Sequence, residues 1–284
     1  MSSDQKSSDQ RSIYDLNLPS DIQNLNRLEL DSLSQEIRQI LLAVGEKCGG
    51  HLASNLGVVE LTLALHSVFE SPKDKFLFDT SHQCYVHKML TGRLDQIYSI
   101  RQEDGLSGFA NIHESDHDTF GAGHASTALS AALGVAHARD QKKETNNVIA
   151  IIGDSSLSGG MSFEALNNIG KLNSNFICIL NDNNMSISKP VGNMSHYITQ
   201  LRTSTVYTAA KKKFERIIDR IPKVGVPLRR RIEKAVERMK DTLLDVKEGV
   251  LFEEFGFKFL GPIDGHNIGH VKAALKFAKT YPGP

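Results

Sequence analysis

The sequence contains no tryptophan, and its three cysteines, Cys48, Cys84 and Cys178, form no C-x-x-C pair. Cysteines this few and this far apart offer neither the disulfide framework of a small secreted domain nor a zinc knuckle. We therefore expect a protein of a reducing compartment, the cytoplasm.

A net charge and long apolar runs are also missing. The 33 Lys and Arg residues balance the 33 Asp and Glu residues, so no overall field attracts nucleic acid or a membrane surface. Two basic runs, 211–213 and 229–231, are interrupted at helical spacing by acidic residues, which is typical of a solvated helical face. No uninterrupted apolar segment approaches the roughly 18 residues that a membrane span needs. We expect neither nucleic acid nor membrane as a partner.

The chain length suits one large domain. The first dozen residues are mostly Ser, Asp, Gln and Lys and lack the patterns of a secretory signal or a transit peptide. We expect residues 1–29 to form a leader, disordered in part, and residues 30–284 to form the domain. A basic amphipathic stretch predicts a helical insertion at about 200–248.

Helical and strand patterns alternate along the domain, which predicts an α/β fold with a parallel sheet flanked by helices. The expected strands are Lys75–Asp79, Val148–Gly153, Phe176–Leu180 and Phe257–Leu260. The expected helices are Leu30–Cys48, Gly57–Phe69, Gly123–Ala138, Met161–Leu172 and Ile268–Lys279. Polar residues that follow such strands gather at one edge of the sheet, where ligands bind in folds of this class.

Two of these polar residues have the chemistry of a magnesium site. Asp154 follows one expected strand and Asn183 follows the next. Carboxylate and amide oxygens on neighbouring strand ends can complete an octahedral magnesium with diphosphate oxygens, a backbone carbonyl and water. Taken alone, Asp154 would more often cap the following helix and Asn183 would more often be a turn residue.

Asp154 and Asn183, with the flanking Gly153 and Ser155, resemble the glycine-aspartate-glycine to asparagine signature of thiamine-diphosphate enzymes. Several longer segments resemble the deoxyxylulose-phosphate synthase family in particular. They are Gly49–Gly57, His82–Arg93, Gly159–Asn167, Ile179–Ser188 and Gly261–His266. The resemblance covers roughly residues 30–284, so the expected fold is the diphosphate-binding domain of a thiamine-diphosphate enzyme.

The resemblance implies a set of site residues and two cofactors, thiamine diphosphate and Mg²⁺. The implied magnesium ligands are Asp154, Asn183 and the backbone carbonyl of Met185. The implied cofactor-binding residues are His82, Gly123, His124, Ala125, Ser155, Ser156 and Asn183. His51 and His82 are the implied catalytic residues, because imidazoles with a pKa near 6.5 suit proton transfer, although single histidines are more often structural.

The implied reaction joins pyruvate, with decarboxylation, to glyceraldehyde 3-phosphate, for isoprenoid and thiamine precursors. The resemblance also implies a second, pyrimidine-binding domain with a cofactor-activating glutamate, and a C-terminal domain. Neither has a counterpart in these 284 residues. We therefore expect the chain to be inactive alone and to act as a homodimer or with a separate C-terminal half.

Two positions depart from the family pattern. Ser155 stands where the family has glycine after the aspartate, and Ser81 stands where it has glycine before the histidine. A side chain is costly where the backbone needs a positive φ. These departures favour one alternative, a non-catalytic thiamine-diphosphate-binding chain. A second alternative, a transketolase-type N-terminal subunit, is disfavoured by the run Asn181–Ser188.

Overall fold

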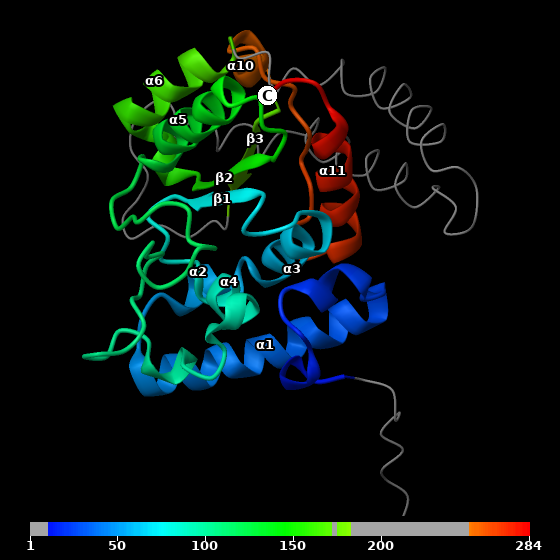
Figure 1. Cartoon of the computed structure of the whole chain (residues 1–284), viewed down its shortest axis with the longest axis vertical. Coiled ribbons are helices and arrows are strands. Elements are labelled where there is room, and N and C mark those ends of the chain that lie inside the picture. Colours follow the sequence, from blue (N-terminus) through cyan, green and yellow to red (C-terminus); the bar gives the residue numbers. More distant parts are fainter. Residues whose placement is uncertain (1–10, 172–174, 183–249) are drawn as a thin grey trace, which may run out of the picture.

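The computed structural model describes residues 11–171, 175–182 and 250–284 (Figure 1). At its centre is a three-stranded parallel sheet in the order β1 (Lys75–Phe78), β2 (Val148–Gly153) and β3 (Ile177–Asn181). Lys75 aligns with Val148, and Gly153 aligns with Asn181, so the carboxyl ends of the strands lie at one edge. The predicted α/β fold with a parallel sheet is confirmed.

Helices cover both faces of this sheet. They are α1 (Arg27–Cys48), α2 (Leu52–Leu56), α3 (Val59–Val68), α4 (Tyr85–Lys88), α5 (Ala128–Gln141), α6 (Gly160–Ile169), α10 (Val250–Glu254) and α11 (Ile268–Thr280). Figure 1 shows α5 and α6 on one side of the sheet and α1, α3 and α4 on the other. Among the described residues, none of these helices combines the length and apolar character needed to cross a membrane.

The two faces have separate cores because successive strand side chains point in opposite directions. Ile149 and Ile151 pack in a cluster with α1, α3 and α11, whereas Ala150 and Ile152 pack with α5 and α6. Burial on both faces explains why β2 reads as a continuous apolar run.

The N-terminal segment contributes to the first core from residue 13 onward. Ile13 and Ile22 are completely buried, and the backbone N–H of Ile13 donates to Glu36 on α1 at 2.8 Å. Helix α1 begins at Arg27, where the Asn26 side chain and Glu29 form a reciprocal capping box. The described fold therefore starts before residue 30, the boundary expected for the leader. Residues 1–10 and the insertion expected at 200–248 lie outside the described residues.

Two predicted elements differ from the structure. The helix expected from Gly123 begins at Ala128, because Gly123 has φ +141° and Ser126 has φ +70°, which a right-handed helix does not allow. The strand expected at 257–260 is wrong. That segment pairs with no described strand, and the N–H of Lys258 donates instead to the carbonyl of Pro284 at 2.9 Å.

Candidate functional site

Acidic residues follow all three strands at the carboxyl edge of the sheet. Asp79 follows β1, Asp154 follows β2 and Asp182 follows β3. The N–H of Asp154 donates to the carbonyl of Asn181 at 3.2 Å, so the ends of β2 and β3 are in direct contact. Asn183 and Met185, expected to bind magnesium with Asp154, lie outside the described residues, although Asn183 directly follows Asp182 in the chain.

The position of Asp154 bears on the alternative that it only caps a helix. Asp154 precedes the 3-10 helix Ser155–Ser158, but its side chain makes no capping hydrogen bond there. Helix α6 begins later, at Gly160, after Gly159. The capping alternative therefore has no support. Within the described ranges, no three His, Cys, Asp or Glu side chains form a metal-binding group, so magnesium would need the neighbouring segment or ligand oxygens.

The turn with Gly123, His124 and Ala125 is joined to the loop after β2 by serine hydroxyls. Ser126 Oγ donates to the carbonyl of the buried Ser156 at 2.7 Å, and Ser162 Oγ donates to the same carbonyl at 2.8 Å. Two of the implied cofactor-binding segments, at 123–125 and 155–156, are therefore held side by side.

Of the two serines that stand where the family has glycine, only Ser81 has the strained backbone with a positive φ. Ser81 has φ +65° and is completely buried, and its Oγ accepts a hydrogen bond from the N–H of Ala110 at 2.9 Å. Ser155 is exposed and does not have a positive φ. A side chain at 155 therefore brings no left-handed backbone strain, whereas Ser81 offsets its strain with a buried hydrogen bond.

Asp79 organises this edge, and sequence reasoning missed it. Its carboxylate is buried and accepts hydrogen bonds from the N–H groups of Ser126 at 2.9 Å and Ala128 at 3.0 Å. It thereby caps the N-terminus of α5 and joins the end of β1 to the turn that contains Gly123. The signal was present in the sequence as an acidic residue directly after an apolar strand.

His51 and His82 are brought together from separate parts of the chain. Their ring centroids are 4.9 Å apart at an interplanar angle of 72°, an edge-to-face contact. His82 Nε2 lies 3.1 Å from Ser54 Oγ, while its buried Nδ1 has no hydrogen-bond partner among the described residues. Burial lowers the pKa of His82, and the neighbouring His51 lowers it further. His82 is thus mainly a neutral imidazole at pH 7, with one ring nitrogen next to Ser54 and the other unpaired among the described residues.

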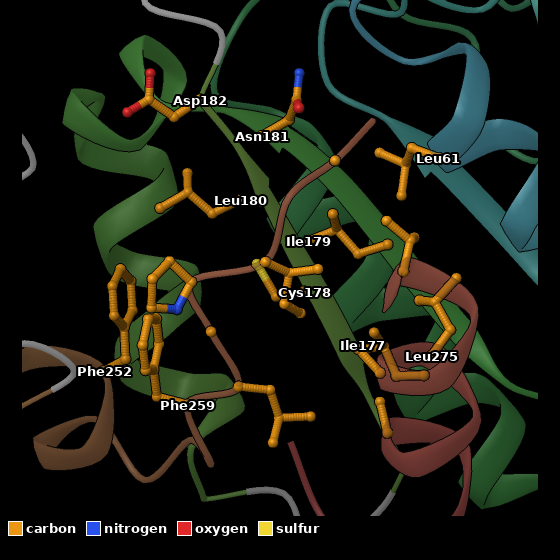
Figure 2. Close-up of a pocket in the computed structure, with 18 of the residues that line it drawn as sticks. Leu61, Ile177, Cys178, Ile179, Leu180, Asn181, Asp182, Phe252, Phe259 and Leu275 are labelled. Carbon is orange, nitrogen blue, oxygen red and sulfur yellow. The ribbon is translucent and has the colours of Figure 1, made fainter. Parts of the chain in front are cut away.

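A cavity of about 870 Å³ runs along β3, the last strand of the sheet in the described part of the chain (Figure 2). Its walls are mostly apolar, with Ile177 and Ile179 of β3 opposite Leu61 and Leu275. Its polar end includes Asn181 and Asp182, at the carboxyl end of the strand. The cavity therefore adjoins the edge of the sheet where the acidic residues gather.

An ion-pair cluster of Arg38, Glu60 and His266 was not predicted, and Arg38 and His266 line the same cavity. Arg38 Nη2 contacts both carboxylate oxygens of Glu60 at 2.7 Å, and His266 Nδ1 lies 3.1 Å from Glu60 Oε2. Burial alone would raise the pKa of Glu60, but hydrogen bonds from Arg38 and His266 lower it overall. The cluster ties the loop 261–266 to α1 and α3. The side chain of Asn267 caps α11.

Solved structures with a similar backbone include transketolases. A transketolase mutant from Pichia stipitis matches with a TM-score of 0.62 at 16% identity, over 89% of this chain and 35% of that chain. Transketolase from Leishmania mexicana matches with a TM-score of 0.61 at 16% identity and the same coverage. The class of fold is therefore that of the transketolase-like α/β proteins.

Sequence comparison identifies the family within that class. The profile described as 1-deoxy-D-xylulose-5-phosphate synthase matches residues 13–284, and the chain belongs to this family. The synthase of Syntrophomonas wolfei is 50% identical over 95% of this chain and 42% of its own length. That of Caldanaerobacter subterraneus is 51% identical over 95% of this chain and 43% of its own length. The chain thus spans less than half the length of these relatives.

Proposed function

We propose that this chain is the diphosphate-binding part of a cytoplasmic 1-deoxy-D-xylulose-5-phosphate synthase. The complete enzyme would join pyruvate, with decarboxylation, to glyceraldehyde 3-phosphate and so supply isoprenoid and thiamine precursors. The observation that carries this proposal is the convergence of Asp154, the turn at Gly123 and the pair His51 and His82 at one edge of the sheet. Family membership over residues 13–284 supports it.

The proposed cofactors are thiamine diphosphate and Mg²⁺. Asp154 fits a magnesium ligand because it lies at a strand end and caps no helix there. Asn183 and the Met185 carbonyl would complete the protein ligands. The segments 123–125 and 155–156 would contact the diphosphate and thiazolium, since they are held together by the Ser126 to Ser156 bond. When bound, thiamine diphosphate supplies the electron sink for decarboxylation.

The histidine pair would perform the proton transfers. The lowered pKa of His82 keeps the ring mainly neutral at pH 7, which is the form that can accept a proton, and its Nδ1 has no hydrogen-bond partner among the described residues. Ser54 restrains the other ring nitrogen, and His51 lies against the ring edge to face. This arrangement orients one imidazole and leaves the other more exposed to an incoming substrate.

The proposed partners include a second polypeptide segment. The chain spans 42% of the length of the Syntrophomonas wolfei synthase, and the glutamate that activates the cofactor would come from a pyrimidine-binding domain. We propose that the chain works as a homodimer or with a separate C-terminal half, and is inactive without that domain. Identity near 50% to these synthases, against 16% to transketolases, favours synthase activity over transketolase activity.

Calorimetric titration with thiamine diphosphate, with and without magnesium, tests the proposal. We expect magnesium-dependent binding that Asp154→Ala abolishes and that Asp95→Ala, at an exposed acidic position, leaves intact. Cofactor binding that neither depends on magnesium nor changes in Asp154→Ala would overturn the proposed metal site. The glutamate-bearing half is then added with both substrates. Intact cofactor binding without carboligation in that mixture would overturn the synthase assignment.

A further inference from the structure

We infer that Asn55 is a positioning residue that ties the backbones of His51 and His82 together and so sets how the two imidazoles face each other. The inference rests on the proposed function only for the role of the histidine pair. The contacts themselves are properties of the chain. Asn55 lies in the short helix α2 and is completely buried.

The Asn55 side chain makes three hydrogen bonds, all to backbone groups. Its Nδ2 donates to the carbonyl of His51 at 2.9 Å and to the carbonyl of His82 at 2.9 Å. Its Oδ1 accepts from the N–H of Tyr85 at 2.9 Å. Both donors and the acceptor of one amide are therefore used within a single junction between α2 and the loop after β1.

These contacts allow only one orientation of the amide. Reversing it would direct an oxygen at two carbonyl oxygens and an NH₂ group at the N–H of Tyr85. The arrangement also suits asparagine better than other residues, because aspartate has no donor and a hydroxyl has only one. Loss of the side chain would leave the carbonyl of His82 and the N–H of Tyr85 buried without these partners, which is costly, whereas the carbonyl of His51 would keep its bond from the N–H of Asn55.

The hydrogen bonds of the Asn55 side chain join the two histidine segments and do not merely stabilise α2. The carbonyl of His51 already accepts the N–H of Asn55 within α2 at 3.3 Å, so the contact to His82 is the one that joins separate segments. Ser54, one residue earlier, contacts the ring of His82 at 3.1 Å. Neighbouring residues of one helix thus hold the backbone and the ring of the same histidine.

Nuclear magnetic resonance of the chain with isotope-labelled histidine tests the inference without any cofactor. We expect Asn55→Ala to abolish the through-space signal between the His51 and His82 rings. We also expect the pKa of His82 to move up toward 6.5, because the ring would lose its burial and its neighbour. A through-space signal and a His82 titration unchanged from the parent chain would overturn the inference.

Asn147 supplies the matched control, since it is also a buried asparagine with a side-chain bond, to Asp74 at 2.8 Å, but precedes β2 at the opposite end of the sheet. Asn147→Ala should lower thermal stability without moving either histidine signal. If Asn55→Ala does not fold, Asn55→Asp serves instead, because it keeps the acceptor for Tyr85 and loses both donated bonds. A retained histidine contact in Asn55→Asp would overturn the inference. These histidine signals are measured without cofactor, so they do not depend on whether the chain binds thiamine diphosphate. The role of Asn55 and the proposed function can therefore be disproved independently.

Discussion

His51 and His82 lie edge to face with ring centroids 4.9 Å apart, although α2, α3 and β1 separate them along the chain. His51 directly precedes α2, and His82 lies in the loop after β1. The contact exists because the sheet and α2 bring these two loops to the same place. His51 therefore influences the protonation of His82.

Replacing His51 with glutamine should raise the pKa of His82. Burial is the larger cause of the lowered pKa and persists in the variant, so the rise should stop short of the ordinary value of 6.5. Titration of the His82 ring by nuclear magnetic resonance measures the change. His113→Gln, at an exposed histidine, should leave the His82 titration unaltered. An unchanged or lowered pKa in His51→Gln would contradict the coupling.

Substitutions at Ser81 should separate backbone strain from hydrogen bonding. Ser81→Ala keeps the positive φ and leaves the N–H of Ala110 without its acceptor, which should cost about 1–3 kcal/mol of unfolding free energy. Ser81→Gly loses the same bond but relieves about 1 kcal/mol of strain. Urea unfolding should therefore find the glycine variant more stable than the alanine variant. Ser155→Gly, where φ is not positive, should show no such gain. Equal stability of the two Ser81 variants would rule out the strain.

The buried pair of Arg93 and Asp118 should be a large contributor to stability. Arg93 donates to both Asp118 oxygens, at 2.7 and 2.8 Å. Asp118→Asn would leave the buried guanidinium with only its longer ion pair to Glu114, at 3.5 Å, and should cost about 3 kcal/mol. Glu70→Gln, which removes an exposed pair with Lys73, should cost about 0–1 kcal/mol. Similar losses in these two variants, measured by urea unfolding, would contradict the distinction.

The same pair predicts acid sensitivity. Burial alone would raise the pKa of Asp118, but hydrogen bonds from Arg93 and His87 hold it well below its usual value of 3.8. A carboxylate with a depressed folded pKa stabilises above its unfolded pKa and loses that contribution as pH falls toward the folded value. We therefore expect the difference in stability between the parent chain and Asp118→Asn to shrink below about pH 3.8, as measured by urea unfolding at several pH values. A difference independent of pH would contradict this expectation.

His66 predicts a second pH dependence, in a higher range. It is completely buried, with Nε2 3.0 Å from His87 Nδ1, and burial lowers its pKa well below 6.5, with smaller effects from His87 and His117. Below pH 6.5 the unfolded state binds a proton that the folded state does not. The free energy of unfolding therefore decreases as the pH is lowered, by up to about 1.4 kcal/mol for each pH unit. His66→Asn should flatten this slope between pH 6.5 and 5 in thermal unfolding. His113→Gln should keep the same dependence of stability on pH. An unaltered slope in His66→Asn would show that His66 does not cause it.

Several features of the protein follow from local sequence pattern. The three strands begin and end within one residue of their predicted limits, because a buried parallel strand reads as an uninterrupted apolar run. The end of α1 at Cys48 also agrees with the predicted limit, whereas the helix begins three residues before the predicted Leu30, at Arg27, after the capping box of Asn26 and Glu29. Asp154, His51 and His82 could be selected as candidates from their residue types and from family segments, and the fold that those segments implied is present.

Tertiary structure alone decided the remaining features. Periodicity cannot show that positive φ angles at Gly123 and Ser126 delay α5, or that the N–H of Lys258 bonds to Pro284 and not to a strand. Nothing local to Asn55 or Asp79 indicates that their partners lie 27 and 47 residues away, at His82 and Ser126. Sequence determines which chemical groups are available and which elements form, because these depend on near neighbours. Which groups meet depends on hydrogen bonds and burial between distant segments, and only the packed chain contains those.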